Sequence, residues 1–322
     1  MMDWTDRHCR YFHRLITRRT RLYTEMITTG ALLHGDVARH LDFHAEEHPL
    51  ALQLGGSEPG DLSQSARLAL RWGYDEVNLN CGCPSERVQR GAFGACLMAE
   101  PGLVRDGVMA MNDALGGDVP VTVKHRIGLG RNEAYATVRD FVGTVAEGGC
   151  QVFIVHARNA WLEGLSPKEN REVPPLRYAV VEQLKADFPT MTFVLNGGVS
   201  DDAQVAAQLA SFDGVMVGRE AYHRPALMAG WDARYLGSDG AVGEPDDDWR
   251  LSIEAQMLAY MQRCSEPWSH VSRHMLGLWH GRPGARRWRQ IWSDHRYKHL
   301  PVAEVARRAS AARIDSHVPL VA

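Results

Sequence analysis

The chain has 322 residues, of which 45% are hydrophobic and 23% charged. This is the composition of an ordinary globular protein, and it excludes a disordered or fibrous chain. At roughly 150 residues per domain, the length predicts two domains, or one barrel-sized domain with an appendage. No stretch approaches the roughly 18 uncharged apolar residues of a membrane span, and the first twenty residues are rich in Asp and Arg. We therefore expect a cytoplasmic protein, a monomer, with no membrane partner.

The cysteine content argues against both a disulfide framework and a zinc site. Six cysteines are too few for a disulfide scaffold of this size, and none form a CxxC pair with matching histidines. We expect free thiols and no bound metal. The six are Cys9, Cys81, Cys83, Cys96, Cys150 and Cys264.

Charge is distributed unevenly along the chain. Residues 1–248 have 24 Lys and Arg against 34 Asp and Glu, whereas the tail from Trp249 onward has 12 against 5. Because clustered Lys and Arg bind phosphates, this pattern is typical of a protein in which one part contacts a polyanion. A solvated helix would also carry such residues, and taken alone that is the better interpretation. We predict a catalytic domain over 1–236, an acidic linker over 237–248 and a basic helical domain over 249–322.

Short β-branched runs alternate with amphipathic, helix-length segments throughout the body. This alternation predicts a parallel α/β sheet, and seven strands over about 235 residues fit a (β/α)8 TIM barrel better than a doubly wound sheet. Predicted strands cover 22–26, 49–54, 76–80, 119–126, 151–156, 191–196 and 213–218. Predicted helices cover 61–72, 103–114, 134–147, 176–188 and 202–210.

One strand of an eight-stranded barrel is missing from this pattern. Residues 1–15 predict a loop and an amphipathic helix, with no β-run in front of them. Since a closed barrel leaves no edge unpaired, we expect the first strand upstream of Met1, about ten to twenty residues away, unless another segment fills the gap.

Nearly every predicted strand ends in polar or glycine residues. In a parallel barrel these ends meet on one face, where active sites lie. The residues are Glu25, Gln53, Asn78, Asn80, Lys124, Arg126, His156, Asn196, Gly197, Gly198, Gly218 and Arg219.

The last two strands end in glycines that suit a phosphate. Gly197 and Gly198 follow one strand, and Gly218 with Arg219 follows the next, so backbone amides and a guanidinium can meet an anion there. Glycine pairs also mark ordinary turns, but two at these neighbouring strands favour a phosphate-bearing ligand. The chain has no GxGxxG fingerprint, which favours FMN over a Rossmann-bound dinucleotide. Lys124 is then expected beside the reduced ring, with Gln53 and His156 bonding its heteroatoms.

Several longer segments are more specific: LQLGGSEPGDL, YDEVNLNCGCPSERVQRGAFGACLM, PVTVKHRIG, HARNAWLEGLSPKENREVPPL, NGGV and DGVMVGREAY. With these segments the chain resembles the tRNA-dihydrouridine synthases. The blocks YTEMITTGALLHGD, GLSPKENREVPPL and RHMLGLWHGRPGARRWR resemble the A subfamily, so the resemblance covers essentially the whole chain. It implies an FMN-binding barrel with a small C-terminal helical domain. It also implies reduction of uridine to 5,6-dihydrouridine in the tRNA D-loop with NADPH, at uridines 20 and 20a.

The resemblance implies roles for individual residues of the body. Cys83, in GCPS, matches the acid that protonates C5 of uridine after hydride reaches C6, and a thiol is largely protonated near neutral pH. The other cysteines are expected to be structural. Met1 and Met2 stand at the end of the family's first flavin-contacting turn. The remaining matches to flavin contacts are Gln53, Lys124, His156, Asn196, Gly197, Gly198, Gly218 and Arg219.

Contacts with tRNA are implied at two places. Beside the catalytic loop, Asn80 matches a uridine- or tRNA-contacting position, and Lys168, Asn170 and Arg171 lie on the loop after the strand at 151–156. In the tail, the matching residues are Arg286, Arg287 and Arg289. An amphipathic helix that buries Trp288 and Trp292 and leaves the arginines solvated explains the same pattern, and both interpretations can hold together.

Two other functions remain open at this point. A dihydroorotate or dihydropyrimidine dehydrogenase would share the barrel and the phosphate loops, but it needs no basic tail. A catalytically silent tRNA-binding protein would retain the tail without the chemistry.

Overall fold

The structure, a computed structural model, describes residues 1–131, 134–239 and 245–314, and it divides into two compact units. The barrel unit comprises residues 1–3 and 21–218, and the helical unit comprises residues 4–20 and 219–322. The predicted boundary at 237–248 therefore differs from this division, which groups 4–20 and 219–236 with the C-terminal helices. Residues 240–244 of the predicted linker lie outside the described residues.

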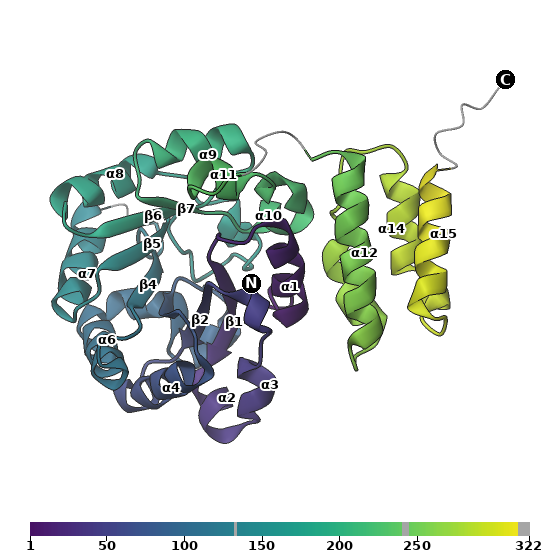
Figure 1. The fold of residues 1–322 in the computed structure, drawn as a ribbon. Helices are drawn as coiled ribbons and strands as arrows, with labels where there is room; N and C mark the ends of the chain where they lie inside the picture. Colours follow the sequence, from purple (N-terminus) through teal and green to yellow (C-terminus); the bar gives the residue numbers. More distant parts are fainter. Residues whose placement is uncertain (132–133, 240–244, 315–322) are drawn as a thin grey trace. The chain divides into compact units, whose positions relative to one another are not determined.

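A parallel sheet forms the centre of the barrel unit. Within the described residues it has seven strands in the order β1 to β7, curled inside a layer of helices (Figure 1). This confirms the predicted strands and the α/β barrel-type fold, with β1 and β7 as the edges. The strands are β1 (Leu22–Thr28), β2 (Leu50–Gly55), β3 (Glu76–Cys81), β4 (Val121–Arg126), β5 (Val152–His156), β6 (Thr192–Asn196) and β7 (Gly214–Met216).

Five helices follow the strands at the predicted places: α4 (Pro59–Trp72), α6 (Pro101–Leu115), α7 (Tyr135–Glu147), α8 (Tyr178–Asp187) and α9 (Asp202–Leu209). Three short helices were not predicted: α2 (Thr29–His34), α3 (Val37–Leu41) and α5 (Glu86–Arg90). Helix α4 begins at Pro59, where no backbone donor is needed, and ends at Gly73, whose φ of 85° suits glycine. Asp201 caps α9 by accepting a hydrogen bond from the backbone of Gln204.

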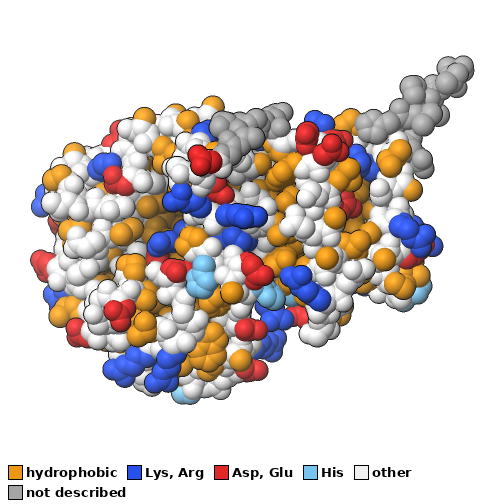
Figure 2. Space-filling view, in the orientation of Figure 1, with side chains coloured by type: hydrophobic (Ala, Val, Ile, Leu, Met, Phe, Trp, Pro, Cys, Tyr) orange, Lys and Arg blue, Asp and Glu red, His pale blue; other side chains and the backbone are white. Residues whose placement is uncertain are grey.

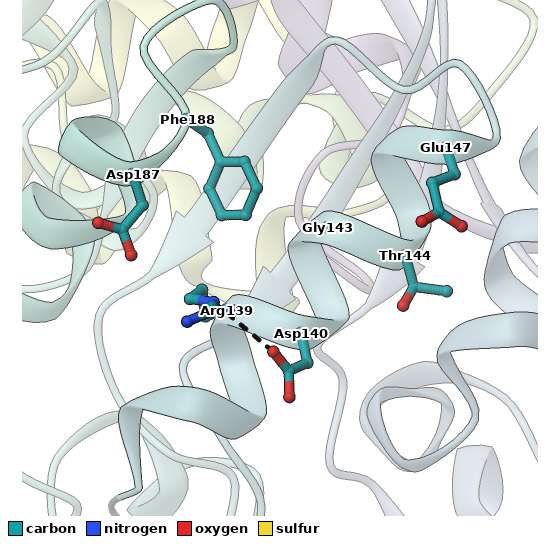
Figure 3. Close-up of a pocket in the computed structure, with 7 residues that line it drawn as sticks. All are labelled: Arg139, Asp140, Gly143, Thr144, Glu147, Asp187 and Phe188. Atoms are coloured by element: carbon teal, nitrogen blue, oxygen red, sulfur yellow. Dashed lines mark ion pairs between the residues drawn. The ribbon is translucent and has the colours of Figure 1, made fainter.

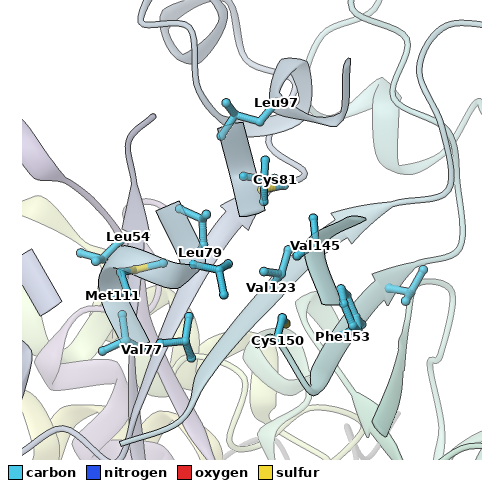
Figure 4. Close-up of a cluster of buried hydrophobic side chains, with 14 of the residues drawn as sticks. Leu54, Val77, Leu79, Cys81, Leu97, Met111, Val123, Val145, Cys150 and Phe153 are labelled. Carbon is cyan, nitrogen blue, oxygen red and sulfur yellow. The ribbon is translucent and has the colours of Figure 1, made fainter. Parts of the chain in front are cut away.

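Alternate residues of each strand face the helices and form the apolar core. On β3 these are Val77, Leu79 and Cys81, all within the core cluster that Figure 4 shows between sheet and helices. Cys81 and Cys150 are fully buried there, and burial raises the pKa of Cys150 to about 12. These two thiols are structural, as the sequence predicts.

The opposite face of β3 carries buried polar side chains that bond to one another. Glu76 accepts hydrogen bonds from Thr122 (2.6 Å) and Tyr23 (2.8 Å). The Thr122 hydroxyl in turn accepts one from Asn78 (2.8 Å). Glu76 also pairs with Arg21. Since each of these buried polar groups has a partner, the interior of the sheet can be polar without a large desolvation cost.

Residues 1–3 contact both edges of the sheet. The backbone N–H of Asp3 donates to Glu25 on β1. The sulfur of Met1 lies 3.6 Å from the place where a Cβ on Gly218, just past β7, would stand. This segment thus occupies part of the gap between β1 and β7.

The helical unit begins with the N-terminal helix. Its helices are α1 (Arg7–Ile16), α10 (Arg219–His223), α11 (Trp231–Tyr235), α12 (Asp247–Arg263), α13 (Trp268–Ser272), α14 (Ala285–Ser293) and α15 (Val302–Ile314). Helix α1 belongs here because Tyr11 stacks on Tyr260 of α12, with ring centroids 4.0 Å apart. No helix in the described part of the chain has the length and apolarity to cross a membrane.

A buried carboxylate joins three segments of the helical unit. Glu254 on α12 accepts hydrogen bonds from the indoles of Trp279 (3.1 Å) and Trp288 (2.9 Å). Burial nevertheless raises its pKa. The two indole donors explain how a charged residue is tolerated in this core.

We expect Thr122→Val to destabilise the barrel unit by about 1–3 kcal/mol for each buried group left unpaired, because Glu76 loses a donor and Asn78 an acceptor. Thr122→Ser keeps the hydroxyl and is the matched control. Thermal and urea unfolding of both variants measure the difference. If the Val variant is as stable as the Ser variant, the polar chain contributes nothing to stability.

Candidate active site at the carboxyl ends of the strands

Strand register brings the predicted polar residues together. Asn80 on β3 is paired with Lys124 on β4, and His156 on β5 is paired with Asn196 on β6. Parallel strands in register present such side chains at the same end of the sheet. With Gln53 on β2, these residues form the candidate site.

Asn80 holds the loop that carries the predicted catalytic cysteine. Its amide nitrogen donates to Gln53 (2.8 Å), and its oxygen accepts the backbone N–H groups of Gly82 (3.0 Å) and Cys83 (2.9 Å). Gln53 in turn donates to Asn78, so the polar chain inside the sheet ends at Cys83. Asn80 is only 8% exposed. The structure thus adds a positioning role to the predicted RNA contact of this residue.

The backbone of the Cys83 loop is bonded to the segment around Gly94. The Cys83 carbonyl accepts a hydrogen bond from the backbone of Ala95 (2.9 Å), while the thiol itself is only partly buried. Gly94 has φ +71°, and a Cβ there would lie 2.7 Å from the Cys83 carbonyl oxygen. Glycine is therefore required at this position. The loop leaves the thiol accessible while its backbone is tied down.

Cations are concentrated at this end of the sheet. Burial, Arg126 and Arg171 lower the pKa of Lys124 to about 7, and its ammonium donates to Asn196 (3.0 Å). Burial and the same cations keep the pKa of His156 well below its usual value. In Figure 2, Lys and Arg side chains are visible over the region of β5 to β7. Burial and neighbouring positive charge thus disfavour the charged form of Lys124, and an anionic ligand beside it would favour that form.

The glycines after β6 allow a close turn beside His156. Gly197 and Gly198 have φ values of +109° and +75°, and a Cβ on Gly197 would lie 2.6 Å from the His156 ring. The hydroxyl of Tyr178 donates to the Gly197 carbonyl (2.7 Å) and holds the turn. Any larger residue would fill the space next to the imidazole.

The other predicted cofactor residues divide between the two units. Gly218 is the last residue of the barrel unit, with Met1 beside it, and Met2 is largely exposed. Arg219 is the first residue of α10 in the helical unit.

The donors and cations of the barrel unit fit a flavin mononucleotide. Lys124, Gln53 and the imidazole of His156 offer hydrogen-bond partners for a heterocycle, and the tight turn at Gly197 and Gly198 suits a phosphate. The cations Lys124 and Arg126 suit its charge.

The loop after β5 differs from its prediction at one residue. Asn170 is fully buried, and its amide bonds to the backbone of Trp161 on both sides, at 2.8 Å each. The side chain of Asn170 is therefore not placed to contact RNA directly. Lys168 and Arg171 are exposed, as an RNA contact requires.

Arg126 was expected on the active-site face as a strand-end residue without a specific role, and the structure gives it one. Its guanidinium is 3% exposed and donates to the carbonyl groups of Gly82 (3.1 Å), Asn159 (3.1 Å) and Asn170 (2.8 Å). It thereby ties the Cys83 loop to the loop after β5. No motif could have revealed this, because three distant backbone segments supply the acceptors.

Two pockets of the barrel unit differ in their relation to these residues. One of ≈ 580 Å³ lies between α7 and the end of α8, lined by Arg139, Asp140 and Phe188 among others (Figure 3). It contains no predicted site residue. Another of ≈ 360 Å³ is lined by the ends of β1 and β2 and by Phe93 of the catalytic loop.

The predicted arginines of the tail lie on α14. Arg286, Arg287 and Arg289 are exposed, whereas Trp288 and Trp292 of the same helix are buried. The amphipathic helix is thus confirmed. Other arginines of the C-terminal region pair with carboxylates, such as Arg282 with Asp247 (2.6 Å). Within the described part of the chain, the three α14 arginines make no ion pair.

The low pKa of Lys124 predicts a pH effect on stability. Between pH 7 and 10.5 the unfolded chain keeps this proton while the folded chain has lost it, so the free energy of unfolding rises with pH. The rise is at most about 1.4 kcal/mol per pH unit for one proton. In unfolding from pH 7 to 9 without added ligand, the wild type should gain stability relative to Lys124→Met. Exposed Lys168→Met is the control, and parallel curves for the wild type and Lys124→Met would refute the effect.

Comparison with known proteins assigns the family. The model of the family described as "Dihydrouridine synthase (Dus)" matches residues 1–313. A tRNA-dihydrouridine(20/20a) synthase of Pseudomonas putida is 58% identical over 92% of this chain and 88% of that protein. One of Vibrio parahaemolyticus is 53% identical over 97% of this chain and 94% of that protein. Morphinone reductase shares the fold, with TM-score 0.52 and 16% identity over 77% of this chain and 85% of that one. The chain therefore belongs to the dihydrouridine synthase family.

Proposed function

We propose that this protein reduces uridine to 5,6-dihydrouridine in the D-loop of tRNA, at positions 20 and 20a, with NADPH as reductant. The observation that carries the proposal is the placement of Cys83, whose backbone Asn80 holds at the carboxyl ends of the strands, near the cations Lys124 and Arg126. The relatives named above share the sequence over nearly its whole length, which supports the same substrate. We assign it to the cytoplasm, as a monomer that needs no metal.

FMN, when bound, supplies the hydride that reaches C6 of the pyrimidine. Gln53, Lys124, His156, Asn196, Gly197 and Gly198 would hold it, together with Met1, Met2, Gly218 and Arg219. Lys124 contributes a positive charge at this site. The pKa of its ammonium group, which is low in the protein without ligand, rises when an anion binds beside it.

Cys83 then delivers its proton to C5 of the uracil ring. The backbone of Cys83 is fixed by Asn80 and by Ala95, so the thiol is presented at a defined place. An acid that is positioned in this way lowers the barrier to protonating the developing enolate. The uridine must leave its base stack to reach the thiol, which requires an unpaired region of the RNA.

The α14 arginines are proposed to bind the RNA backbone. Exposed arginines without carboxylate partners among the described residues can neutralise phosphates, and the buried tryptophans fix the helix that presents them. In this assignment residues 249–314 form the RNA-binding part of the helical unit. A dehydrogenase of free pyrimidines has no use for such a surface.

Replacing Cys83 by Ala should slow dihydrouridine formation by about 10²- to 10⁴-fold, because the positioned acid is removed. Reduction of the flavin by NADPH should be unchanged. Cys264→Ala, which removes a partly exposed thiol of the helical unit, is the control. Dihydrouridine is quantified in tRNA that lacks the modification. Full activity of Cys83→Ala would reject the assignment of the acid, and a wild type that binds tRNA without converting it would favour the silent binder.

The double change Arg286→Gln and Arg289→Gln should weaken tRNA binding and flatten its salt dependence. For every phosphate that is no longer neutralised, the slope of log affinity against log salt becomes shallower by about 0.7 to 0.9. Arg308→Gln is the control, because that side chain is already paired with Glu304 at 2.7 Å. Binding is measured across a salt series. An unchanged slope would mean that the α14 arginines do not touch phosphates.

A further inference from the structure

Two loops of the barrel unit run together beyond the ends of β4 and β5. Backbone hydrogen bonds join them, from Gly130 to Ala160 (2.7 Å) and from Ala160 to Gly128 (2.9 Å). The side chain of Asn159 adds a bond to the Gly130 carbonyl (3.1 Å). This short ladder continues the parallel pairing of the two strands past the sheet.

An arginine and a tryptophan stack directly after this ladder. The guanidinium carbon of Arg131 lies 4.2 Å from the ring centroid of Trp161. Arg131 is exposed and Trp161 half-buried, so the pair, called here the stacking pair, offers a flat cationic surface to solvent. Arg131 makes no ion pair with a carboxylate of the described residues. A cation–π contact of this kind orients the guanidinium plane without neutralising its charge.

The backbone of Trp161, the aromatic member of the stacking pair, is held by a buried amide. Asn170 accepts the backbone N–H of Trp161 and donates to its carbonyl, while being itself fully buried. Its amide nitrogen also donates to the carbonyl groups of Leu165 (3.3 Å) and Ser166 (3.4 Å), so one buried side chain fixes several residues of this loop, Trp161 among them.

The same brace connects the stacking pair to the catalytic loop. Arg126 donates to the carbonyl groups of both Asn170 (2.8 Å) and Gly82 (3.1 Å). From the other side Gln89, on α5 just after Cys83, donates to Leu162 (3.2 Å). The stacking pair and the Cys83 loop are thus parts of one hydrogen-bonded assembly.

We propose that Arg131 and Trp161 form a stacking platform for an unpaired nucleobase of the substrate RNA, a neighbour of the uridine that enters the site. Single-stranded RNA is bound by stacking its splayed bases on aromatic rings and on arginine planes. The exposed cations Lys168 and Arg171, on the same loop as Trp161, suit the adjoining phosphates. This inference rests on the proposed function, because it takes tRNA as the substrate.

The test measures tRNA affinity and KM for four variants of the stacking pair. Trp161→Ala should weaken binding roughly tenfold with an unchanged salt slope, because a base stack disappears and no charge is removed. Trp161→Phe should retain most of the affinity. Arg131→Lys should bind more weakly than wild type, because it keeps the charge but lacks the planar guanidinium, and Arg131→Ala, which lacks both, should bind more weakly still. Arg71→Ala is the control, since it removes an exposed arginine from the last turn of α4, at the opposite end of the barrel.

An abasic substitution identifies the base. When the nucleotide next to the target uridine lacks its base, wild type and Trp161→Ala should bind that tRNA equally, since the stacked partner is gone. Binding by Arg131→Lys that equals wild type, or a Trp161→Ala defect that persists with every flanking abasic tRNA, would overturn the platform. These outcomes differ from a failure of the proposed function, in which the wild type itself forms no dihydrouridine. The thermal midpoint of each variant separates weaker binding from impaired folding.

Discussion

The active-site geometry depends on one run of buried hydrogen bonds. It starts at Glu76, near the amino end of β3, and passes through Thr122, Asn78 and Gln53 to Asn80. Because β3 alternates, every second residue of the strand adds a link, while the residues between them build the apolar core outside. Asn80 ends the run by holding two backbone amides of the Cys83 loop. The position of Cys83 is therefore set by the interior of the sheet and not by the loop alone.

A second constraint is electrostatic. Lys124 and Arg126 stand two positions apart on β4, and burial together with the charge of Arg171 lowers the pKa of both. A cation whose charged form is disfavoured in this way costs stability in the protein without ligand, and an anion bound beside it would relieve part of that cost.

The sequence predicted the parts of this structure that depend on local pattern. The strands were predicted because short β-branched runs that end in polar residues repeat along the chain. The burial of Trp288 and Trp292 was predicted because the two lie four residues apart, on one face of a helix. The role of Asn170 was not predictable, since an asparagine between charged residues reads as exposed. Only the fold shows that it is buried against Trp161. Arg126 was expected at the carboxyl ends of the strands, but its three backbone acceptors were not predictable because they lie far apart in the sequence.

The division of the chain into two units also depends on contacts between residues that are far apart in the sequence. Composition marks the acidic stretch at 237–248, and Asp246 in it caps α12. Packing, however, groups α1 with the C-terminal helices because Tyr11 stacks on Tyr260, a pairing across about 250 residues that no local signal reveals. The chain accordingly passes from one unit to the other between Gly218 and Arg219, inside a segment that reads as a single motif in the sequence. A boundary predicted from composition marks the place where the charge of the chain changes. A boundary taken from packing marks the place where one hydrophobic core ends. In this chain the two boundaries lie about twenty residues apart, because the sequence of α10 and α11 has no excess of either charge.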